Sequence, residues 1–285
     1  MKSKNSRHFS IEFYPPRSKE GINKLDKVHA ELAGLNPNFF SVTYGAGGST
    51  KAGTKNLVLD FKNQGSNIVP HLSFIGTSEV EIRELLNNYS DSGISRIVAL
   101  RGDLPSGSPI SNRYASELVE FIRKETDEQF HIDVACYPEM HPESLSIESE
   151  VAFFKKKVDA GANSAITQYF YNTDSYFRYC DYCSKKGIRI PIVPGIMPIT
   201  NYQNLSRFSR NCGAEIPRWL RYRLEALSND KKGLQEFGIE VVSDLCEKLL
   251  SGGAPGLHFY SMNLSKSIIR IWNNLGLPEN NKIKL

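Results

Sequence analysis

The sequence predicts a single-domain (β/α)8 barrel, the TIM-barrel class of α/β fold. The first observation is that short apolar runs recur along the chain without the polar alternation of a half-exposed strand, as in parallel strands covered on both faces. The second is that most of these runs stop at a polar or aromatic residue. The third is length, because 285 residues suit one barrel with insertions, a fold that typically takes about 250 residues.

Eight runs account for the expected strands. They span residues 9–13, 39–44, 68–73, 97–100, 132–136, 165–169, 190–193 and 257–260. Each interval between them has room for a crossover helix, which a parallel connection requires. Active sites of this fold gather at the carboxyl ends of the strands. The residues that end the runs are therefore the first candidates for chemistry.

Helical patterns fill the intervals between the runs. Ser78 and Glu81 form a capping-box pattern, apolar residues follow at helical spacing, and Gly93 ends the segment. Weaker patterns cover residues 25–35, 55–61, 114–124, 147–160 and 173–185. The long interval before the last run predicts two or three extra helices beside the barrel mouth. We expect residues 1–8 to form a flexible N-terminus, 9–277 the barrel and 278–285 a tail.

Composition and charge indicate what kind of molecule the protein binds and where in the cell it is located. The net charge is +4, from 35 basic and 31 acidic residues that are scattered along the chain. This balance suits anionic small molecules and does not suggest nucleic acid. No apolar run approaches the ~20 residues of a membrane span, and the basic N-terminus lacks the apolar core of a signal peptide. We expect a cytoplasmic protein with no membrane partner.

The cysteines favour reduced thiols over a disulfide framework, because there are five of them spread over a long chain. Cys180 and Cys183 form a C-x-x-C pair inside the predicted helix 173–185. A second pair at metal-binding spacing does not follow. We therefore predict neither a metal site nor a redox role there.

Two carboxylates end predicted strands in opposite surroundings. Glu12 lies among aromatic and aliphatic residues, which favour the protonated form and suit a general acid. The alternative for Glu12 is an ion pair with a barrel lysine or arginine. Asp103 follows Arg101 and Gly102, so we expect it to stay ionised and to stabilise a nearby cation. The alternative for Asp103 is a helix cap or a salt bridge.

Other strand ends carry groups whose interpretation stays open. The glycine-rich turn 43–50 has neither the P-loop pattern nor the dinucleotide fingerprint, so it is either a close approach of backbone to a ligand or a plain tight turn. His71 and His141 have no third ligand at metal spacing. The lysines at 155–157 form either a solvated face or a grip on a pyrophosphate. Gln168 could hold a heterocycle through its amide or satisfy nearby backbone groups.

Taken together, these motifs closely resemble the methylenetetrahydrofolate reductase family in its short bacterial form. The matching stretches are residues 9–17 (FSIEFYPPR), 41–46 (SVTYGA), 70–72 (PHL), 97–105 (IVALRGDLP), 137–143 (YPEMHPE), 157–163 (KVDAGAN), 166–168 (ITQ), 194–198 (PGIMP) and 258–260 (HFY). The resemblance implies an FAD-containing (β/α)8 oxidoreductase. Such an enzyme reduces 5,10-methylenetetrahydrofolate to 5-methyltetrahydrofolate by a ping-pong reaction through FAD and supplies methyl groups for methionine synthesis.

The resemblance also implies NADH or NADPH as the electron donor, with NADH favoured by the short bacterial forms, and a homo-oligomer, either a dimer or a tetramer. By the same resemblance Glu12 protonates N10 of the folate, Asp103 stabilises the resulting cation, Gln168 holds the pterin and Phe208 stacks on the ligand. The implied substrate-binding residues are Glu12, Asp103, Gln168, Asn204, Phe208 and Tyr260. The implied flavin-binding residues are Thr43, Tyr44, Ala46, His71, Arg101, Gly102, Asp103, Tyr114, Ala115, Tyr137, His141, Lys156 and Lys157.

Two positions depart from the family pattern. Leu264 follows Asn263 where the family usually has an arginine, and Asn204 replaces a glutamine found in some relatives. Loss of the arginine removes a charge-assisted contact to the folate tail, for which Lys266 could compensate. Two alternative functions follow: a related folate-dependent barrel with altered substrate, and a folate- or flavin-binding subunit that acts only with partners. The presence of both Glu12 and Asp103 argues against a pure binder.

Overall fold

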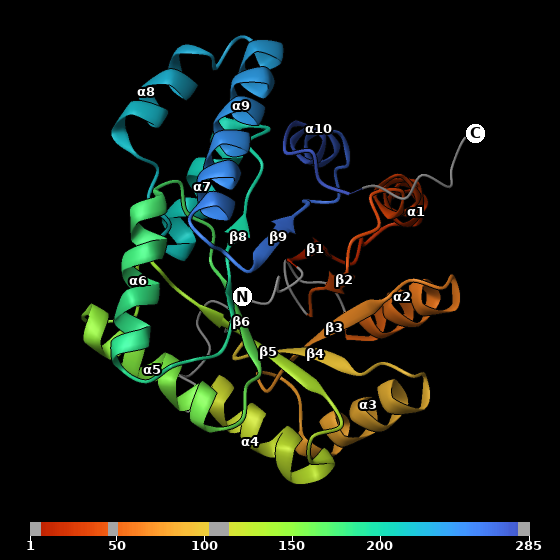
Figure 1. Ribbon diagram of the computed structural model, residues 1–285. Helices are drawn as coiled ribbons and strands as arrows, with labels where there is room; N and C mark the ends of the chain where they lie inside the picture. The colour runs from red at the N-terminus through yellow and green to blue at the C-terminus, as the bar shows by residue number, and fades with distance from the viewer. Residues whose placement is uncertain (1–6, 45–50, 103–113, 279–285) are drawn as a thin grey trace.

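The computed structural model describes residues 7–44, 51–102 and 114–278, and within these ranges the chain forms a barrel of parallel strands surrounded by helices (Figure 1). The strands are β1 (His8–Phe13), β2 (Phe39–Val42), β3 (Ile68–Ser73), β4 (Arg96–Leu100), β5 (His131–Cys136), β6 (Ser164–Thr167), β7 (Ile192–Val193), β8 (Gly195–Ile196) and β9 (Gly256–Tyr260). Their order around the sheet is β7-β6-β5-β4-β3-β2-β1-β9-β8, and every pair is parallel. The predicted (β/α)8 class is confirmed.

One position in the barrel, between β6 and β9, is filled by two short strands in place of one. We call each strand position of the barrel a stave, and this one the seventh stave. β7 pairs with β6, and β8 pairs with β9. Pro194 separates them and has no N–H to donate to the ladder; its carbonyl accepts a hydrogen bond from the His258 backbone N–H at 3.0 Å. β7 ends at Val193 as predicted but begins at Ile192 rather than at residue 190, and the stave resumes after Pro194 at Gly195 and completes the ring.

Helices cover the outside of the ring. They are α1 (Lys19–Ala33), α2 (Lys51–Asn63), α3 (Glu79–Asp91), α4 (Ala115–Thr126), α5 (Ile147–Asp159), α6 (Thr173–Lys185), α7 (Tyr202–Cys212), α8 (Arg218–Ala226), α9 (Lys231–Ser251) and α10 (Lys266–Asn274). The predicted capping box starts α3, since Glu81 N–H donates to Ser78 Oγ at 3.2 Å and Ser78 N–H donates to Glu81 Oε2 at 2.7 Å. In the described chain, no helix is long and apolar enough to cross a bilayer.

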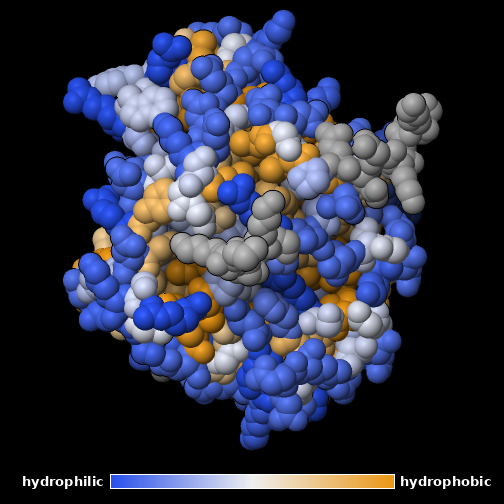
Figure 2. All heavy atoms as spheres, in the orientation of Figure 1, coloured by the Kyte–Doolittle hydropathy of each residue, from blue (hydrophilic) through white to orange (hydrophobic). Residues whose placement is uncertain are grey.

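The long interval before β9 holds the predicted extra helices. α7, α8 and α9 all lie there, and α8 with the adjoining end of α9 projects beyond the ring of strands (Figure 1). Hydrophilic side chains cover much of the outer rim of the face shown in Figure 2. The insertion therefore adds helices beside the barrel while the strand order stays that of a plain (β/α)8 fold.

The core has two parts because alternate residues of a strand face opposite sides of the sheet. Ile11 and Phe13 point outward and pack with the helices in the large cluster between sheet and helices. A smaller cluster of Phe39, Val69 and Val98, with Ile166, fills the barrel interior. This apolar interior layer separates the amino ends of the strands from the mouth at their carboxyl ends.

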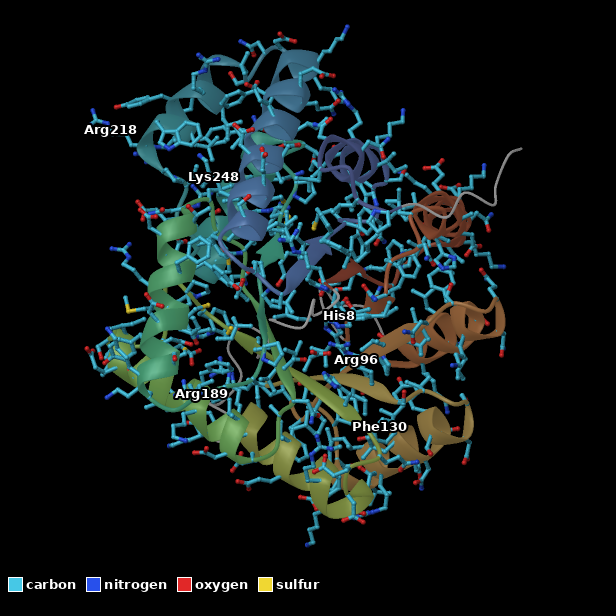
Figure 3. The ribbon with its side chains drawn as sticks, in the orientation of Figure 1. His8, Arg96, Phe130, Arg189, Arg218 and Lys248 are labelled. Atoms are coloured by element: carbon cyan, nitrogen blue, oxygen red, sulfur yellow. The ribbon has the colours of Figure 1, made fainter. Side chains whose placement is uncertain are left out.

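A buried ion pair closes the amino end of the barrel. Arg96, at the start of β4, donates from Nε and Nη2 to the carboxylate of Asp133 at 2.6 and 2.8 Å, and its guanidinium lies 4.3 Å from the ring centre of Phe39. Figure 3 shows Arg96 in the middle of the ring of strands. Burial alone would raise the pKa of Asp133, but hydrogen bonds from Arg96, His131 and Ser164 hold it far below its usual value.

We expect Arg96→Met to destabilise the protein by roughly 3–5 kcal/mol at neutral pH, because it removes the cationic partner of a fully buried carboxylate. The folded pKa of Asp133 lies below the unfolded one, so this contribution is complete above the unfolded value and is lost as pH falls through the folded value. Urea unfolding monitored by circular dichroism measures both effects. Arg83→Met is the matched control, since Arg83 makes the same two-bond pair with Glu125 on the surface and should cost far less. An equal loss in both variants would contradict this assignment.

Candidate active site

The centre of the mouth is a carboxylate between two histidines. Glu12 Oε2 lies 3.5 Å from Nε2 of His71 and 3.5 Å from Nε2 of His258. The Glu12 side chain keeps 17% of its surface exposed, whereas the histidines are almost completely buried. Glu12 therefore reaches solvent or a ligand on one side and imidazole edges on the other. In the described chain its nearest titratable partners are these histidines, rather than the lysine or arginine of the alternative interpretation.

Strand pairing brings these three residues together. Ser10 and Glu12 occupy alternate positions of β1 and face the interior, where β9 pairs Ser10 with His258 and Glu12 with Tyr260. His71 comes from β3, one stave beyond β2, on which Ser41 pairs with Glu12. The period of two along each strand puts every second side chain in the interior. The cluster is thus a direct consequence of register in a closed parallel barrel.

The environment of His71 favours the neutral imidazole. Burial lowers the pKa of His71 below its ordinary value of 6.5, and the nearby Glu12 carboxylate opposes that shift only in part. Neither ring nitrogen makes a hydrogen bond within the described residues. A buried imidazole with two unsatisfied nitrogens is unusual in a folded protein.

Tyr260 forms one wall of the mouth. Its hydroxyl donates to the Thr167 carbonyl at 2.7 Å, which carries the ring across the broken seventh stave. Gly195 lies beneath it, and a Cβ there would stand 2.6 Å from the Tyr260 ring and closer still to the Thr167 oxygen. Only glycine fits at this position. Burial raises the pKa of Tyr260 well above its ordinary value, so the phenol stays neutral.

A cationic group lies beside β4 and β5. Arg101 makes a two-bond pair with Glu143 at 2.6 and 2.8 Å. The Lys157 ammonium donates to the Ala135 carbonyl at 2.6 Å, and burial lowers its pKa. The ring of His141 lies edge-on to that of Tyr137, with centroids 4.8 Å apart. Burial lowers the pKa of His141, with Glu143 opposing that effect. Four of the predicted flavin-binding residues thus lie in one region.

The turn after β4 depends on glycine. Gly102 has a φ of +88°, and a Cβ there would clash with Ser73 Oγ. Ser73 Oγ itself donates to the Arg101 carbonyl at 2.5 Å and so joins the ends of β3 and β4. The backbone at residues 101–102 is therefore held tightly against β3. Asp103, which follows directly, and Ala46 both lie outside the described residues.

Thr43 and Tyr44, two of the predicted flavin-binding residues, directly follow the end of β2. The Thr43 carbonyl accepts from Thr54 at 3.0 Å, while its own hydroxyl oxygen is buried without a hydrogen-bond partner in the described chain. The Tyr44 hydroxyl lies 3.3 Å from Thr77 Oγ1. The strand itself stops at Val42, two residues earlier than predicted.

The rim between α4 and α5 carries the outermost predicted flavin contacts. Tyr114 is half exposed, stacks on Phe153 with centroids 6.5 Å apart, and precedes Ala115, the first residue of α4. Lys156 lies over the same Phe153 ring at 5.5 Å. Lys155 instead pairs with Asp159 at 2.6 Å on the surface. The three lysines therefore lie in different surroundings. Lys155 belongs to a solvated face, Lys156 lies at the rim, and Lys157 lies in the mouth.

Within the described residues, the predicted substrate-binding residues near β6 and on α7 make no hydrogen bond or ring contact with one another, whereas Glu12 lies close to its two histidines. Gln168 follows β6, and its amide oxygen accepts from the Tyr169 N–H at 3.0 Å, in line with the backbone-satisfying alternative for that oxygen. Phe208 is half-buried against the core, and Asn204 is exposed one turn before it on α7. A hydrogen bond of 3.0 Å between Tyr169 and Ser209 ties α7 to the end of β6.

Sequence reasoning gave no role to His258 or Ser10, although both lie in motifs that resemble the family. The signal was available in the strand period: each lies two residues before a predicted site residue, Tyr260 or Glu12. Across residues 7–44, 51–102 and 114–278 there is no group of three or more His, Cys, Asp or Glu side chains that could hold a metal ion.

The fold and this site define the class: a (β/α)8 protein with an acid, buried imidazoles and cations at the carboxyl ends of its strands. The methylenetetrahydrofolate reductase family model matches residues 1–276. The 5,10-methylenetetrahydrofolate reductase of Buchnera aphidicola (subsp. Schizaphis graminum) is 40% identical over 269 residues, covering 94% of this chain and 91% of the relative. The Escherichia coli K12 protein of the same name is 38% identical over 269 residues, covering 94% and 90%. The chain belongs to the methylenetetrahydrofolate reductase family.

Plant and structural relatives extend this comparison. Methylenetetrahydrofolate reductase (NADH) 1 of Arabidopsis thaliana is 36% identical over 96% of this chain, which spans 49% of the plant protein. A solved structure described as an uncharacterized protein from Clostridium thermocellum that binds two copies of 5-methyl-5,6,7,8-tetrahydrofolic acid superposes with a TM-score of 0.71. It is 17% identical and is matched over 96% of this chain and 97% of its own. At that identity the likeness supports the fold alone.

The burial of His71 predicts a pH dependence of stability. Because the folded pKa of His71 lies below 6.5, its contribution is complete above pH 6.5 and is lost as pH falls toward the folded value. We expect the free energy of unfolding to fall between about pH 7.5 and pH 5.5, with a slope of up to about 1.4 kcal/mol per pH unit from one such group. Urea unfolding should show a shallower slope for His71→Gln. His8→Gln, at an exposed position, should keep the full slope; a wild-type slope in His71→Gln would contradict the assignment.

Proposed function

We propose that this chain is a flavin-dependent methylenetetrahydrofolate reductase that reduces 5,10-methylenetetrahydrofolate to 5-methyltetrahydrofolate. The observation that carries the proposal is Glu12, a partly exposed carboxyl group held against two buried imidazoles at the mouth of a barrel of this family. The names of the bacterial relatives support the substrate, and the plant relative's name supports NADH as the donor. Supply of methyl groups for methionine synthesis follows from the same proposal.

Two features of the mouth fit FAD: buried polar atoms without hydrogen-bond partners, and cationic side chains. The Thr43 hydroxyl and both nitrogens of His71, all in the predicted flavin-binding set, are buried without hydrogen-bond partners in the described chain. A polar ligand would satisfy them, as buried polar groups require. Lys157 and Arg101 would hold the anionic pyrophosphate. Bound there, FAD would accept a hydride from the nicotinamide and pass it to the folate.

The protein's own residues would then prepare the folate. Glu12 gives its proton to N10, the bond between N10 and the bridging methylene breaks, and the cation left on the N5 iminium is open to the hydride. Asp103 would stabilise that cation, and Gln168 would hold the pterin through the part of its amide that is not bonded to Tyr169. Phe208, Asn204 and Tyr260 would line the side of the ligand.

The remaining expectations stay proposals of the same kind. We propose a homo-oligomer, either a dimer or a tetramer, in the cytoplasm. All five cysteines are free thiols, and three of them are buried, as suits a reducing compartment.

Half-reactions test the role of Glu12. The purified protein should be yellow, anaerobic NADH should bleach it, and methylenetetrahydrofolate should restore the colour. Glu12→Gln should still bleach but reoxidise at least about a hundredfold more slowly, because a neutral amide cannot donate the proton. Stopped-flow absorbance measures both steps. Glu125→Gln, a surface change of the same type, should behave as wild type. Normal reoxidation of Glu12→Gln would remove Glu12 as the acid, and a colourless protein that binds no added FAD would refute the flavin.

The departure at Leu264 gives a separate test of the substrate. Leu264 lies beside Tyr260 and Pro198 in a small surface pocket. The Asn263 side chain holds this turn to Tyr14, donating at 2.8 Å and accepting at 3.1 Å. A longer cationic side chain at 264 could therefore reach a ligand that extends past Tyr260.

We expect Leu264→Arg to lower the KM for methylenetetrahydrofolate about tenfold, since a charge-assisted contact to a carboxylate is restored, with little change in kcat. Steady-state kinetics with the monoglutamate substrate measures this. Val80→Arg on α3, also an exposed apolar position, should leave KM unchanged. If Leu264→Arg raises KM, the altered-substrate alternative is favoured.

A further inference from the structure

Behind Glu12 the barrel interior contains a chain of polar side chains. Ser10 Oγ lies 2.7 Å from His258 Nδ1, and the opposite ring nitrogen, Nε2, lies 3.5 Å from Glu12 Oε2. Ser10 and His258 are paired across β1 and β9, and Glu12 is the next interior residue of β1. The three side chains therefore form one line from the barrel interior to the mouth.

The line is buried, and its imidazole is packed between aromatic rings. His258 is completely buried and Ser10 is 3% exposed. The imidazole lies edge-on to the Tyr260 ring, with centroids 5.3 Å apart, and near the Phe39 ring at 6.2 Å. These contacts confine the ring plane. In such surroundings hydrogen bonds are stronger than in water, and an unpaired polar atom is costly.

The Ser10 hydroxyl can support the tautomer of His258 that Glu12 favours. A neutral imidazole has one donor and one acceptor, and the partner of one nitrogen decides the state of the other. An ionised Glu12 only accepts, so Nε2 must carry the proton when it faces the carboxylate. Nδ1 then has to accept, and the Ser10 hydroxyl is placed to donate to it. His71 lacks such a partner among the described residues, because neither of its nitrogens is hydrogen-bonded.

We infer that Ser10 and His258 are positioning residues that hold an N–H on Glu12 and stabilise the carboxylate formed when Glu12 gives its proton to the folate. The inference rests on the proposed function. His258 Nε2 lies 3.5 Å from Glu12 and makes no hydrogen bond within the described residues; we expect this contact to shorten when substrate binds, as contacts of catalytic groups often do. Ser10 acts only through His258, whereas His258 acts directly on Glu12.

Other titratable groups face this line. His71 approaches the same Glu12 oxygen from β3, and Tyr260 interacts with Glu12 from β9. Asp133 on β5 influences His71 from the amino end of the barrel but is paired with Arg96. Tyr260 is neutral, and Asp133 is ionised throughout the working range. Neither of these two groups therefore changes its charge beside the line in that range.

The chain offers a matched control for removing the hydroxyl. Ser41 pairs with Glu12 in the register of β1 and β2 and is as deeply buried as Ser10. Its hydroxyl makes no hydrogen bond within the described residues. Ser41→Ala therefore makes the same chemical change in the same region without touching the line.

The first experiment uses the ligand-free protein and does not depend on activity. With 15N-labelled histidine, NMR at about pH 8, where a histidine of ordinary pKa is neutral, should show His258 protonated at Nε2 in wild type. Ser10→Ala should give a mixture of tautomers, and Ser41→Ala should match wild type. His258→Gln identifies the resonance. Finding the proton on Nδ1 in wild type, or no change in Ser10→Ala, would overturn the inference whatever reaction the enzyme performs.

The second experiment measures the two half-reactions of the holoenzyme. Ser10→Ala should reduce with NADH within about twofold of wild type but reoxidise with methylenetetrahydrofolate about tenfold more slowly, the size of one lost hydrogen bond to a charged group. Ser41→Ala should change neither rate.

A double-mutant cycle separates positioning from packing. The amide that His258→Gln introduces can donate to Glu12 without help from Ser10, so Ser10→Ala should have at most about a twofold further effect in that background. Equal slowing of both half-reactions, independent effects of the two changes, or slowing by Ser41→Ala would each overturn the inference. A wild-type protein that fails to reoxidise with folate would instead refute the proposed function and leave the NMR result standing.

Discussion

The site depends on the parallel pairing of β1 with β9. That pairing puts Ser10 opposite His258 and Glu12 opposite Tyr260, so the carboxyl group, the imidazole and the phenol have their positions fixed by backbone hydrogen bonds. The turn after β9 strengthens this arrangement, because the Ser261 hydroxyl donates to the Glu12 carbonyl and Asn263 holds Tyr14. A shift of register by one residue would turn Glu12 into the outer core and remove the site.

The site also depends on closure of the barrel at the interrupted strand position, β7 and β8. The seventh stave is broken at Pro194, and side-chain contacts replace part of the missing ladder. Thr167 accepts from the Gly195 N–H at 2.9 Å through its hydroxyl and from Tyr260 at 2.7 Å through its carbonyl. The absence of a side chain at Gly195 lets the Tyr260 ring lie across the break. One aromatic residue thus both closes the barrel and lines the mouth.

The buried polar groups at the two ends of the barrel interior differ in how completely they are hydrogen-bonded. At the amino end, Asp133 is fully paired by Arg96 and has no group left to offer a ligand. At the mouth, His71 has no hydrogen bond to either nitrogen within the described residues, and Glu12 keeps part of its surface open. Satisfied polar groups stabilise a fold, whereas unsatisfied ones favour binding of a ligand that completes them. The apolar layer of Phe39, Val69, Val98 and Ile166 lies between the two ends.

The sequence by itself determined the class of fold, the positions of the strands within a few residues and the capping of α3, because apolar periodicity and caps are local properties. It also indicated Glu12, His71 and Tyr260, because each lies near the end of a strand and strand ends share one mouth. Only the tertiary structure decided that His258 and Ser10 stand behind Glu12, that the seventh stave resumes after Pro194, and that Lys155, Lys156 and Lys157 point to three different surroundings. These features depend on register between strands far apart in the chain and on the direction of individual side chains, which no local pattern encodes.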